Sequence, residues 1–275
     1  MHPRERRSSA GSLWPPPEVR QVCDTYLSMV DEAAPGLVEG LYLHGSLGFG
    51  EWYAGRSDVD FVAVTSHRPD SATVRLLRDV HDRVAETFPR PAYDGFYCTW
   101  TDLARPTASC PDVPCTLGGT FETQGRLDVN PVTWHELAWH GETVRGARLD
   151  DVEIWTDLRV LREYSHGNLS SYWQKQADAI AQFPAEASKP EIVTWFVLGV
   201  TRLHHLLATD RLTSKDGAGR HVVDAFGEEW RILAAEALSY RATGERIGVL
   251  PDEELAAQLV AFAQLSVRES LALRP

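Results

Sequence analysis

A pair of carboxylates at the start of an apolar segment constrains the fold of this chain more than any other feature. A first apolar segment runs directly into Gly45 and Ser46, and ten residues later Asp58 and Asp60 open a second one over 59–65. Side chains alternate along a β-strand, so Asp58 and Asp60 lie on the same face. Adjacent carboxylates repel each other unless a cation lies between them. The pattern therefore predicts two buried strands beside a cation site.

The residue types at this site indicate which cation and which partner it takes. Mg²⁺ is typically bound by one or two carboxylates together with phosphate oxygens of a substrate. Gly45 permits a tight turn, in which backbone N–H groups and the Ser46 hydroxyl can approach a phosphate. Either pattern alone is most often an ordinary turn. Together, each attached to an apolar strand, they favour a site for Mg²⁺ and a phosphate compound.

Apolar periodicity divides the chain into an α/β half and a helical half. The predicted fold class is α+β, a mixed sheet with helices followed by an all-helical domain. The predicted domains are a flexible leader at 1–16, a first domain at 17–150 and a helical domain at 151–275. The predicted elements are a helix near 19–30, strands at 41–44, 59–65 and from 94 to 100, a helix at 71–88, a long irregular loop at 104–131, and helices at roughly 157–183, 190–209, 216–225, 228–243 and 252–271.

Composition excludes several classes of protein. Of the 275 residues 43% are hydrophobic, but no stretch approaches the ~20 consecutive apolar residues of a membrane helix. The basic start has no apolar stretch behind it, so we expect a cytoplasmic protein without a secretory signal. The net charge of −12 disfavours nucleic acid and membrane as partners and is compatible with a cationic small substrate. Four cysteines without zinc-site spacing are expected to be free thiols.

The segment from residue 41 to 65 resembles the signature of a known superfamily. A hydrophobic residue, Gly45 and Ser46, followed by Asp58 and Asp60, is similar to the hG[GS]…DxD pattern of DNA polymerase β-like nucleotidyltransferases. The ten-residue spacing before Ser57-Asp-Val-Asp is similar to that of the aminoglycoside 3''/9-adenylyltransferases. In the helical half, Thr201-Arg-Leu and the segment 208–216, Ala-Thr-Asp-Arg-Leu-Thr-Ser-Lys-Asp, are also similar to that family.

The resemblance implies a nucleotidyltransferase domain at 17–150 and a set of site residues. It implies that Asp58 and Asp60 bind Mg²⁺, with two ions expected. It implies nucleotide contacts from Gly45, Ser46, Ser57, Asn130, Arg202, Lys215 and Tyr240, and acceptor contacts from Trp173, Glu191 and Thr194.

A third carboxylate completes the site in that family, where a Glu stands at the start of the next strand. This chain has Asp94 there, 34 residues after Asp60. Because Asp is one methylene shorter, Asp94 is either the base that takes the proton of the attacking hydroxyl or mainly a third metal ligand. Asp102 and Glu122 are alternative bases.

The implied activity is Mg²⁺-dependent transfer of AMP from ATP to a hydroxyl of an aminoglycoside or aminocyclitol of the streptomycin or spectinomycin type. Pyrophosphate is released, and the family is typically monomeric. Two alternatives stay open. The acceptor can be a different small molecule or a macromolecule, or the chain is a catalytically degenerate, nucleotide-binding regulatory protein, which the Glu-to-Asp change supports.

A metal-protease motif is excluded by spacing. His135-Glu-Leu-Ala-Trp-His140 resembles HExxH, but its histidines are five residues apart. On a helix they point about 140° apart and cannot share a zinc ion.

Overall fold

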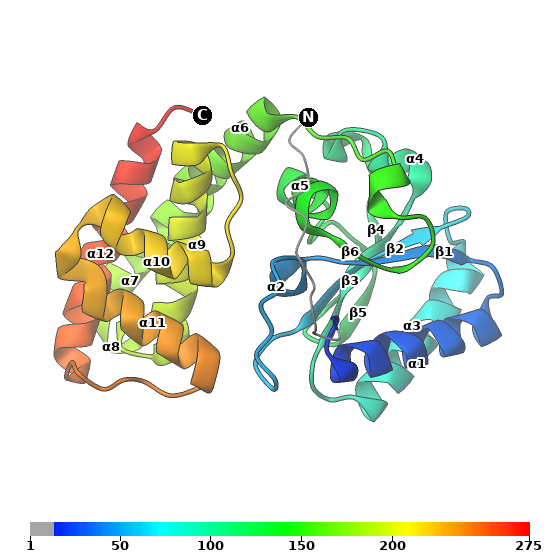
Figure 1. The fold of residues 1–275 in the computed structure, drawn as a ribbon, viewed down its shortest axis with the longest axis horizontal. Coiled ribbons are helices and arrows are strands. Elements are labelled where there is room, and N and C mark those ends of the chain that lie inside the picture. The colour runs from blue at the N-terminus through cyan, green and yellow to red at the C-terminus, as the bar shows by residue number, and fades with distance from the viewer. Residues whose placement is uncertain (1–13) are drawn as a thin grey trace. The chain divides into compact units, whose positions relative to one another are not determined.

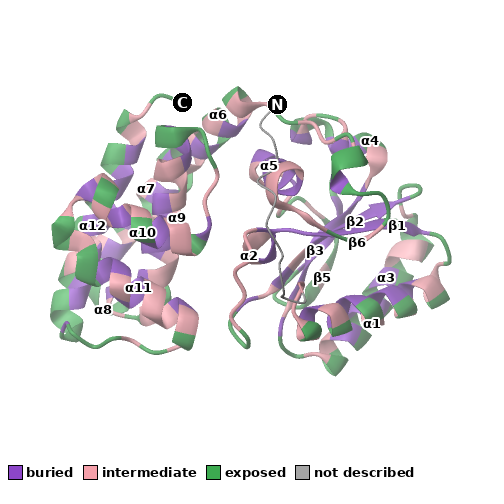
Figure 2. Ribbon diagram, in the orientation of Figure 1, coloured by how far each residue is buried: buried purple, intermediate pink, exposed green. Residues whose placement is uncertain are grey.

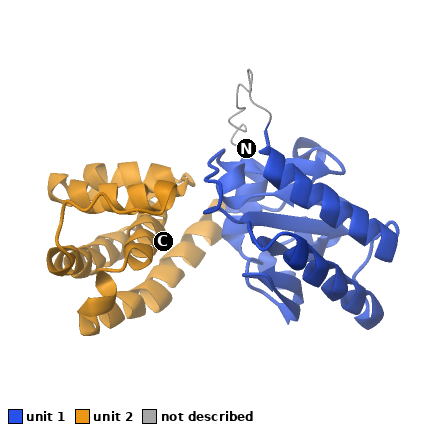
Figure 3. Ribbon diagram, turned by 90° about the horizontal axis from the view of Figure 1, so that it is seen from below, with its two compact units in different colours: residues 1–157 blue, residues 158–275 orange. Residues whose placement is uncertain are grey.

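The computed structural model describes residues 14–275, so most of the predicted leader lies outside the described residues. The chain divides into two compact units (Figure 3), unit 1 up to Asp157 and unit 2 from Leu158 to Pro275. The predicted fold class is confirmed, because a mixed sheet with helices is followed by a helical part.

Unit 1 is built on a six-stranded sheet (Figure 1) with the order β5-β4-β3-β2-β1-β6. β2 and β3 are parallel, and the other neighbouring strands are antiparallel. The strands are β1 (Val38–Leu43), β2 (Val59–Thr65), β3 (Tyr93–Thr99), β4 (Val113–Leu117), β5 (Thr120–Gly125) and β6 (Glu142–Arg145). The helices are α1 (Pro17–Ala33), α2 (Gly45–Gly48), α3 (Ser71–Thr87), α4 (Trp100–Leu103) and α5 (Pro131–His140), with 3₁₀ turns at Thr107–Ser109 and Leu149–Asp151.

The two faces of the sheet pack against different helices, which gives unit 1 two cores. Along β2, Val59, Phe61 and Ala63 pack with α1 and α3, whereas Val62 and Val64 pack with α5. This alternation is the period of two expected for a strand that is buried on both faces. Figure 2 shows the buried residues concentrated along the strands and on the helix faces turned toward them.

The predicted irregular loop at 104–131 is wrong. The segment contains a 3₁₀ turn and the hairpin of β4 and β5, which extends the sheet beyond β3. Gly118 and Gly119 both have positive φ, +56° and +75°, and connect the two strands. Two consecutive residues with positive φ are typical of the tight hairpin turn whose twist matches that of the strands.

Unit 2 is helical and its core surrounds α9 (Pro190–Thr209). Buried side chains of α9 pack with those of α7, α10, α11 and α12. Among the described residues α9 is also the one helix long and apolar enough to cross a membrane by composition, as core helices of globular units often are. The other helical elements are α6 (Leu158–Asn168), a π-helical turn at Leu169–Trp173, α7 (Gln174–Gln182), α8 (Pro184–Ala187), α10 (Lys215–Phe226), a 3₁₀ turn at Glu228–Trp230, α11 (Arg231–Thr243) and α12 (Asp252–Ala272).

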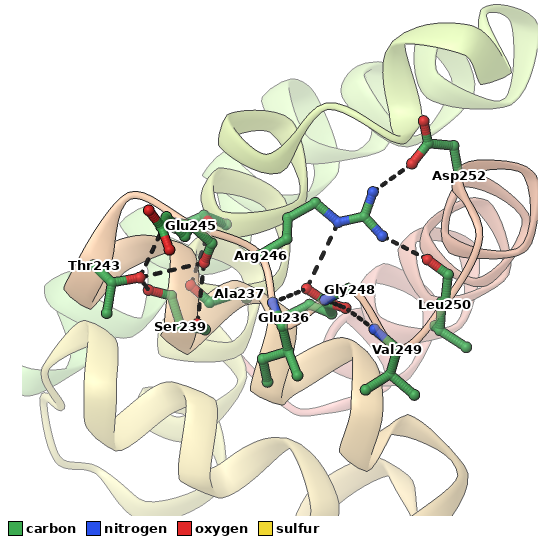
Figure 4. A network of polar contacts seen from close by, with 12 residues as sticks. Glu236, Ala237, Ser239, Thr243, Glu245, Arg246, Gly248, Val249, Leu250 and Asp252 are labelled. Carbon is green, nitrogen blue, oxygen red and sulfur yellow. Dashed lines mark hydrogen bonds and ion pairs between the residues drawn. The ribbon is translucent and has the colours of Figure 1, made fainter.

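A buried carboxylate holds the loop between α11 and α12 (Figure 4). Glu236 is only 2% exposed and accepts hydrogen bonds from the amides of Ile247, Gly248 and Val249, at 2.9, 2.9 and 3.2 Å. Arg246 lies 3.7 Å from the same carboxylate. Hydrogen bonds to several backbone amides offset the cost of burying a charge, so Glu236 fixes this loop.

Candidate active site

Gly45 forms a turn that packs directly against Asp60. Its φ is +57°, and a Cβ built on it would lie 2.1 Å from Oδ2 of Asp60. The amide of His44 also donates to the carbonyl of Asp60, at 3.0 Å. A side chain at position 45 would displace the carboxylate, so the turn requires glycine for both its conformation and its contact.

The structure brings the three predicted aspartates to one end of the sheet. Asp58 directly precedes β2, and Asp60 on β2 is paired in register with Asp94 on β3. Asp60 and Asp94 alternate with Phe61 and Tyr93, which face α1 and α3, and therefore lie on the α5 face. Burial is the main cause that raises the pKa of the Asp94 carboxyl, and the nearby charge of Asp58 also acts to raise it.

Both oxygens of Asp94 are bonded to the β4–β5 turn. Oδ2 accepts from the amide of Gly118 at 2.9 Å, and Oδ1 from the amide of Gly119 at 3.2 Å. These bonds favour the charged form, but the burial of Asp94, which is 7% exposed, outweighs them and its pKa is raised. The sequence prediction missed this contact because it placed the turn in an irregular loop.

Asp58 and Asp60 provide two protein carboxylates that could hold a metal ion, and Asp94 stays a prediction as a third ligand. Within residues 14–275 no group of three or more His, Cys, Asp or Glu side chains is arranged to hold a metal ion. Oδ1 of Asp58 is buried without a hydrogen bond and lies 3.7 Å from Nη1 of Arg90. Asp58 and Asp60 suit Mg²⁺ that takes its other ligands from phosphate and water.

Glu136, which sequence reasoning did not assign to the site, contacts the Gly45 turn. Its Oε2 accepts from the amide of Gly45 at 3.3 Å and lies 3.2 Å from Nδ1 of His44. Burial acts to lower the pKa of His44, but Glu136, Asp60 and Asp128 outweigh it, so the pKa is raised. Sequence reasoning also missed Asp128. Burial is the main cause that raises the pKa of Asp128, whereas the charge of His44 acts to lower it.

The other predicted contacts in unit 1 have structural partners. Oγ of Ser57 accepts from the amide of Tyr53 at 3.1 Å, within the loop before β2. The side chain of Asn130 caps α5, accepting from the amides of Val132 and Thr133 at 2.9 and 3.2 Å. The two alternative bases differ in exposure. Asp102 is buried and binds Arg68 at 2.9 Å, whereas Glu122 is exposed on β5.

The predicted nucleotide contacts of unit 2 lie on three helices that pack against one another. Arg202 is on α9, Lys215 begins α10 and Tyr240 is on α11. Nε of Arg202 is buried and has no hydrogen-bond partner among the described residues. Ser214 caps α10 by accepting from the amide of Gly217 at 2.8 Å, which fixes where the helix begins beside Lys215.

The predicted acceptor contacts differ in exposure. Trp173 is 7% exposed and packs against Phe196 and Gly199 in the core of unit 2. The hydroxyl of Thr194 donates to the carbonyl of Ala237 at 3.2 Å and so connects α9 with α11. Glu191 is exposed in the first turn of α9.

Comparison with known proteins shows the fold. No family model matches the sequence, and no curated protein matches it. A similar solved structure is that of spectinomycin adenyltransferase AAD(9) from Enterococcus faecialis with ATP and spectinomycin. The TM-score is 0.65 at 13% sequence identity, over 90% of this chain and 98% of that chain. The protein therefore has the fold of this nucleotidyltransferase.

Proposed function

We propose that the protein transfers AMP from ATP to a hydroxyl group of a small molecule and releases pyrophosphate. The proposed acceptor is an aminoglycoside or aminocyclitol of the streptomycin or spectinomycin type. The observation that carries the proposal is the contact between the Gly45 turn and Asp60, with Asp58 beside them, in a chain that has the fold of a spectinomycin adenyltransferase. The net charge of −12 is compatible with a cationic acceptor.

In this reaction the chain's own residues hold the phosphates and receive a proton. The acceptor oxygen forms a bond to the α-phosphorus of ATP, and the bond from this phosphorus to the oxygen of the leaving pyrophosphate breaks. Mg²⁺ held by Asp58 and Asp60 would neutralise phosphate charge and align the oxygens. The hydroxyl proton passes to a carboxylate, for which Asp94 is the proposed acceptor. Its raised pKa suits a proton acceptor.

A second candidate function is a nucleotide-binding regulatory protein without turnover. Both oxygens of Asp94 are already bonded to the β4–β5 turn, and no three-carboxylate metal group is formed within residues 14–275. In this second candidate the turn holds Asp94 at a position where it neither binds a metal ion nor receives the proton of an acceptor. This reading predicts ATP binding with no transfer to any acceptor.

The test is pyrophosphate release with ATP, Mg²⁺ and a panel that includes streptomycin and spectinomycin. We expect turnover with a member of the panel, and a loss of at least about 100-fold in the Asp60→Asn variant. Asp79→Asn, at an exposed position on α3, is the matched control and should retain full activity. ATP binding without turnover supports the regulatory protein, and unchanged turnover in both Asp58→Asn and Asp60→Asn contradicts the proposed site.

The remaining assignments rest on the resemblance. We propose that Arg202, Lys215 and Tyr240 contact the nucleotide, which predicts weaker ATP binding when Arg202 or Lys215 is replaced by alanine. We also expect a monomeric, cytoplasmic protein, and size-exclusion chromatography with light scattering tests the first of these expectations.

A further inference from the structure

Helix α5 reaches the Gly45 turn through a buried carboxylate. Glu136 is 7% exposed and lies 91 residues after Gly45 in the chain. Its Oε2 accepts from the Gly45 amide at 3.3 Å, and the same oxygen lies 3.2 Å from Nδ1 of His44. An ionised Glu136 can only accept, so Nδ1 of His44 then carries the proton of this contact.

The backbones of α2 and α5 approach closely beside this contact. A Cβ on Gly48 would lie 3.0 Å from the carbonyl oxygen of His140 at the end of α5. The ring of His140 also packs on that of Phe49, with centroids 4.3 Å apart. This end of α2 is therefore held by van der Waals contact, whereas the Gly45 end is held by the hydrogen bonds to Glu136.

Gly45 lies between two carboxylates that act on it in different ways. Asp60 packs against its Cα, where no Cβ fits, and Glu136 accepts from its amide. The first contact limits the conformation of the turn, and the second limits its orientation toward α5. Without Glu136 the half-buried Gly45 amide would lose its carboxylate acceptor, and the turn would be free to reorient toward another acceptor.

We propose that Glu136 is a positioning residue, which holds the Gly45–Ser46 turn against Asp60 in the geometry that receives the nucleotide phosphates. This inference rests on the proposed function. Glu136 need not touch the nucleotide, since it acts through the amide of Gly45 and the ring of His44. Its contribution is to nucleotide binding and alignment rather than to the proton transfer.

The test compares Glu136→Ala and Glu136→Gln with a matched control in unit 2. Glu236→Ala removes a carboxylate that is also buried and also accepts from backbone amides, but from those of the α11–α12 loop (Figure 4). The readouts are the Kd of MgATP by calorimetry, kcat and KM from pyrophosphate release, and the thermal midpoint. Binding and kinetics are measured at a temperature below the thermal midpoint of each variant.

We expect Glu136→Ala to weaken MgATP binding by about tenfold or more, the size of one lost hydrogen bond to a charged acceptor. Glu136→Gln retains an amide oxygen that can accept from Gly45, so it should recover most of the affinity. Glu236→Ala should lower the thermal midpoint and leave the affinity within about twofold of wild type.

Three outcomes contradict the inference. If the MgATP affinity and the KM change no more in Glu136→Ala than in Glu236→Ala, the role of Glu136 is merely structural. Glu136→Gln as weak as Glu136→Ala would show that the charge, not the hydrogen bond, matters. If Glu136→Ala does not fold, amide hydrogen exchange at Gly45 in the wild-type protein still decides, because an unprotected Gly45 amide excludes the hydrogen bond to Glu136. If the wild-type protein binds no MgATP, the proposed function fails together with the inference. If wild type binds MgATP and Glu136→Ala binds it equally well, only the inference fails.

Discussion

The amide of Gly118 donates a 2.9 Å hydrogen bond to Oδ2 of Asp94, so a hairpin turn at the edge of the sheet holds a carboxylate of the candidate site. The neighbouring amide of Gly119 binds the other oxygen. Asp94 in turn is paired in register with Asp60. The turn therefore determines where the Asp94 carboxylate lies relative to the carboxylates proposed to bind Mg²⁺.

We predict that Gly118→Ala lowers turnover through Asp94 and not through loss of stability. Gly118 has a φ of +56°, and alanine in that conformation costs about 1–2 kcal/mol. Gly36→Ala is the matched control, because Gly36 has a φ of +74° and, like Gly118, no atom within 4 Å of an added Cβ. Urea unfolding should show similar losses in both variants, and pyrophosphate release should fall in Gly118→Ala alone. Equal turnover in the two would mean that the turn does not govern Asp94.

A substitution of Asp94 itself decides between base and metal ligand. Asn can accept only one of the two turn amides and cannot take the proton, so we predict that Asp94→Asn lowers kcat by about 100-fold or more. Its affinity for MgATP should stay within about threefold of wild type, because Asp58 and Asp60 still bind the metal. Calorimetry with MgATP checks this. An affinity loss as large as that of Asp60→Asn would instead make Asp94 a metal ligand.

The role of Trp173 in the core of unit 2 can be tested through its contact with Gly199. A Cβ on Gly199 would lie 2.4 Å from the Trp173 ring, so we predict that Gly199→Ala destabilises unit 2 by about 1–3 kcal/mol through overpacking. Trp173→Phe should remove the clash, and the double variant should be more stable than the sum of the single changes predicts. Additive effects in urea unfolding would show that the two residues do not compete for this space.

Local patterns predicted some elements of this fold well, and contacts distant in the chain explain the rest. The apolar run at 59–65 is found as β2 because a strand buried on both faces has a continuous apolar sequence. The hairpin of β4 and β5 was missed, although Gly118-Gly119 between two short segments is itself a hairpin signal. Glu136 had no local signal at all. It lies in a segment that resembled a protease motif, and its contact with Gly45 exists only because α5 packs on α2.

The last prediction concerns acid stability, which depends on His81 in the core between the sheet and α3. Burial lowers the pKa of His81 from 6.5 to about 3. Its Nε2 lies 2.7 Å from the hydroxyl of Tyr97, which itself accepts from Tyr26 and so donates to His81. The folded protein thus favours a neutral His81 imidazole, whereas in the unfolded chain His81 takes up a proton near its ordinary pKa of 6.5. Between these two pKa values the unfolded state binds more protons, so the free energy of unfolding falls as the pH is lowered.

We therefore expect a loss of about 1.4 kcal/mol for each pH unit below 6.5 from this one group. Burial lowers the pKa of His204 in unit 2 to about 4, which acts in the same direction. The contribution of His81 is isolated by His81→Gln, which keeps an acceptor for the Tyr97 hydroxyl but does not titrate. Urea unfolding between pH 7 and pH 5 should give a shallower pH dependence in this variant. Equal slopes in wild type and variant would show that His81 has the same pKa in the folded and the unfolded protein, because only a difference between these two pKa values links its titration to folding.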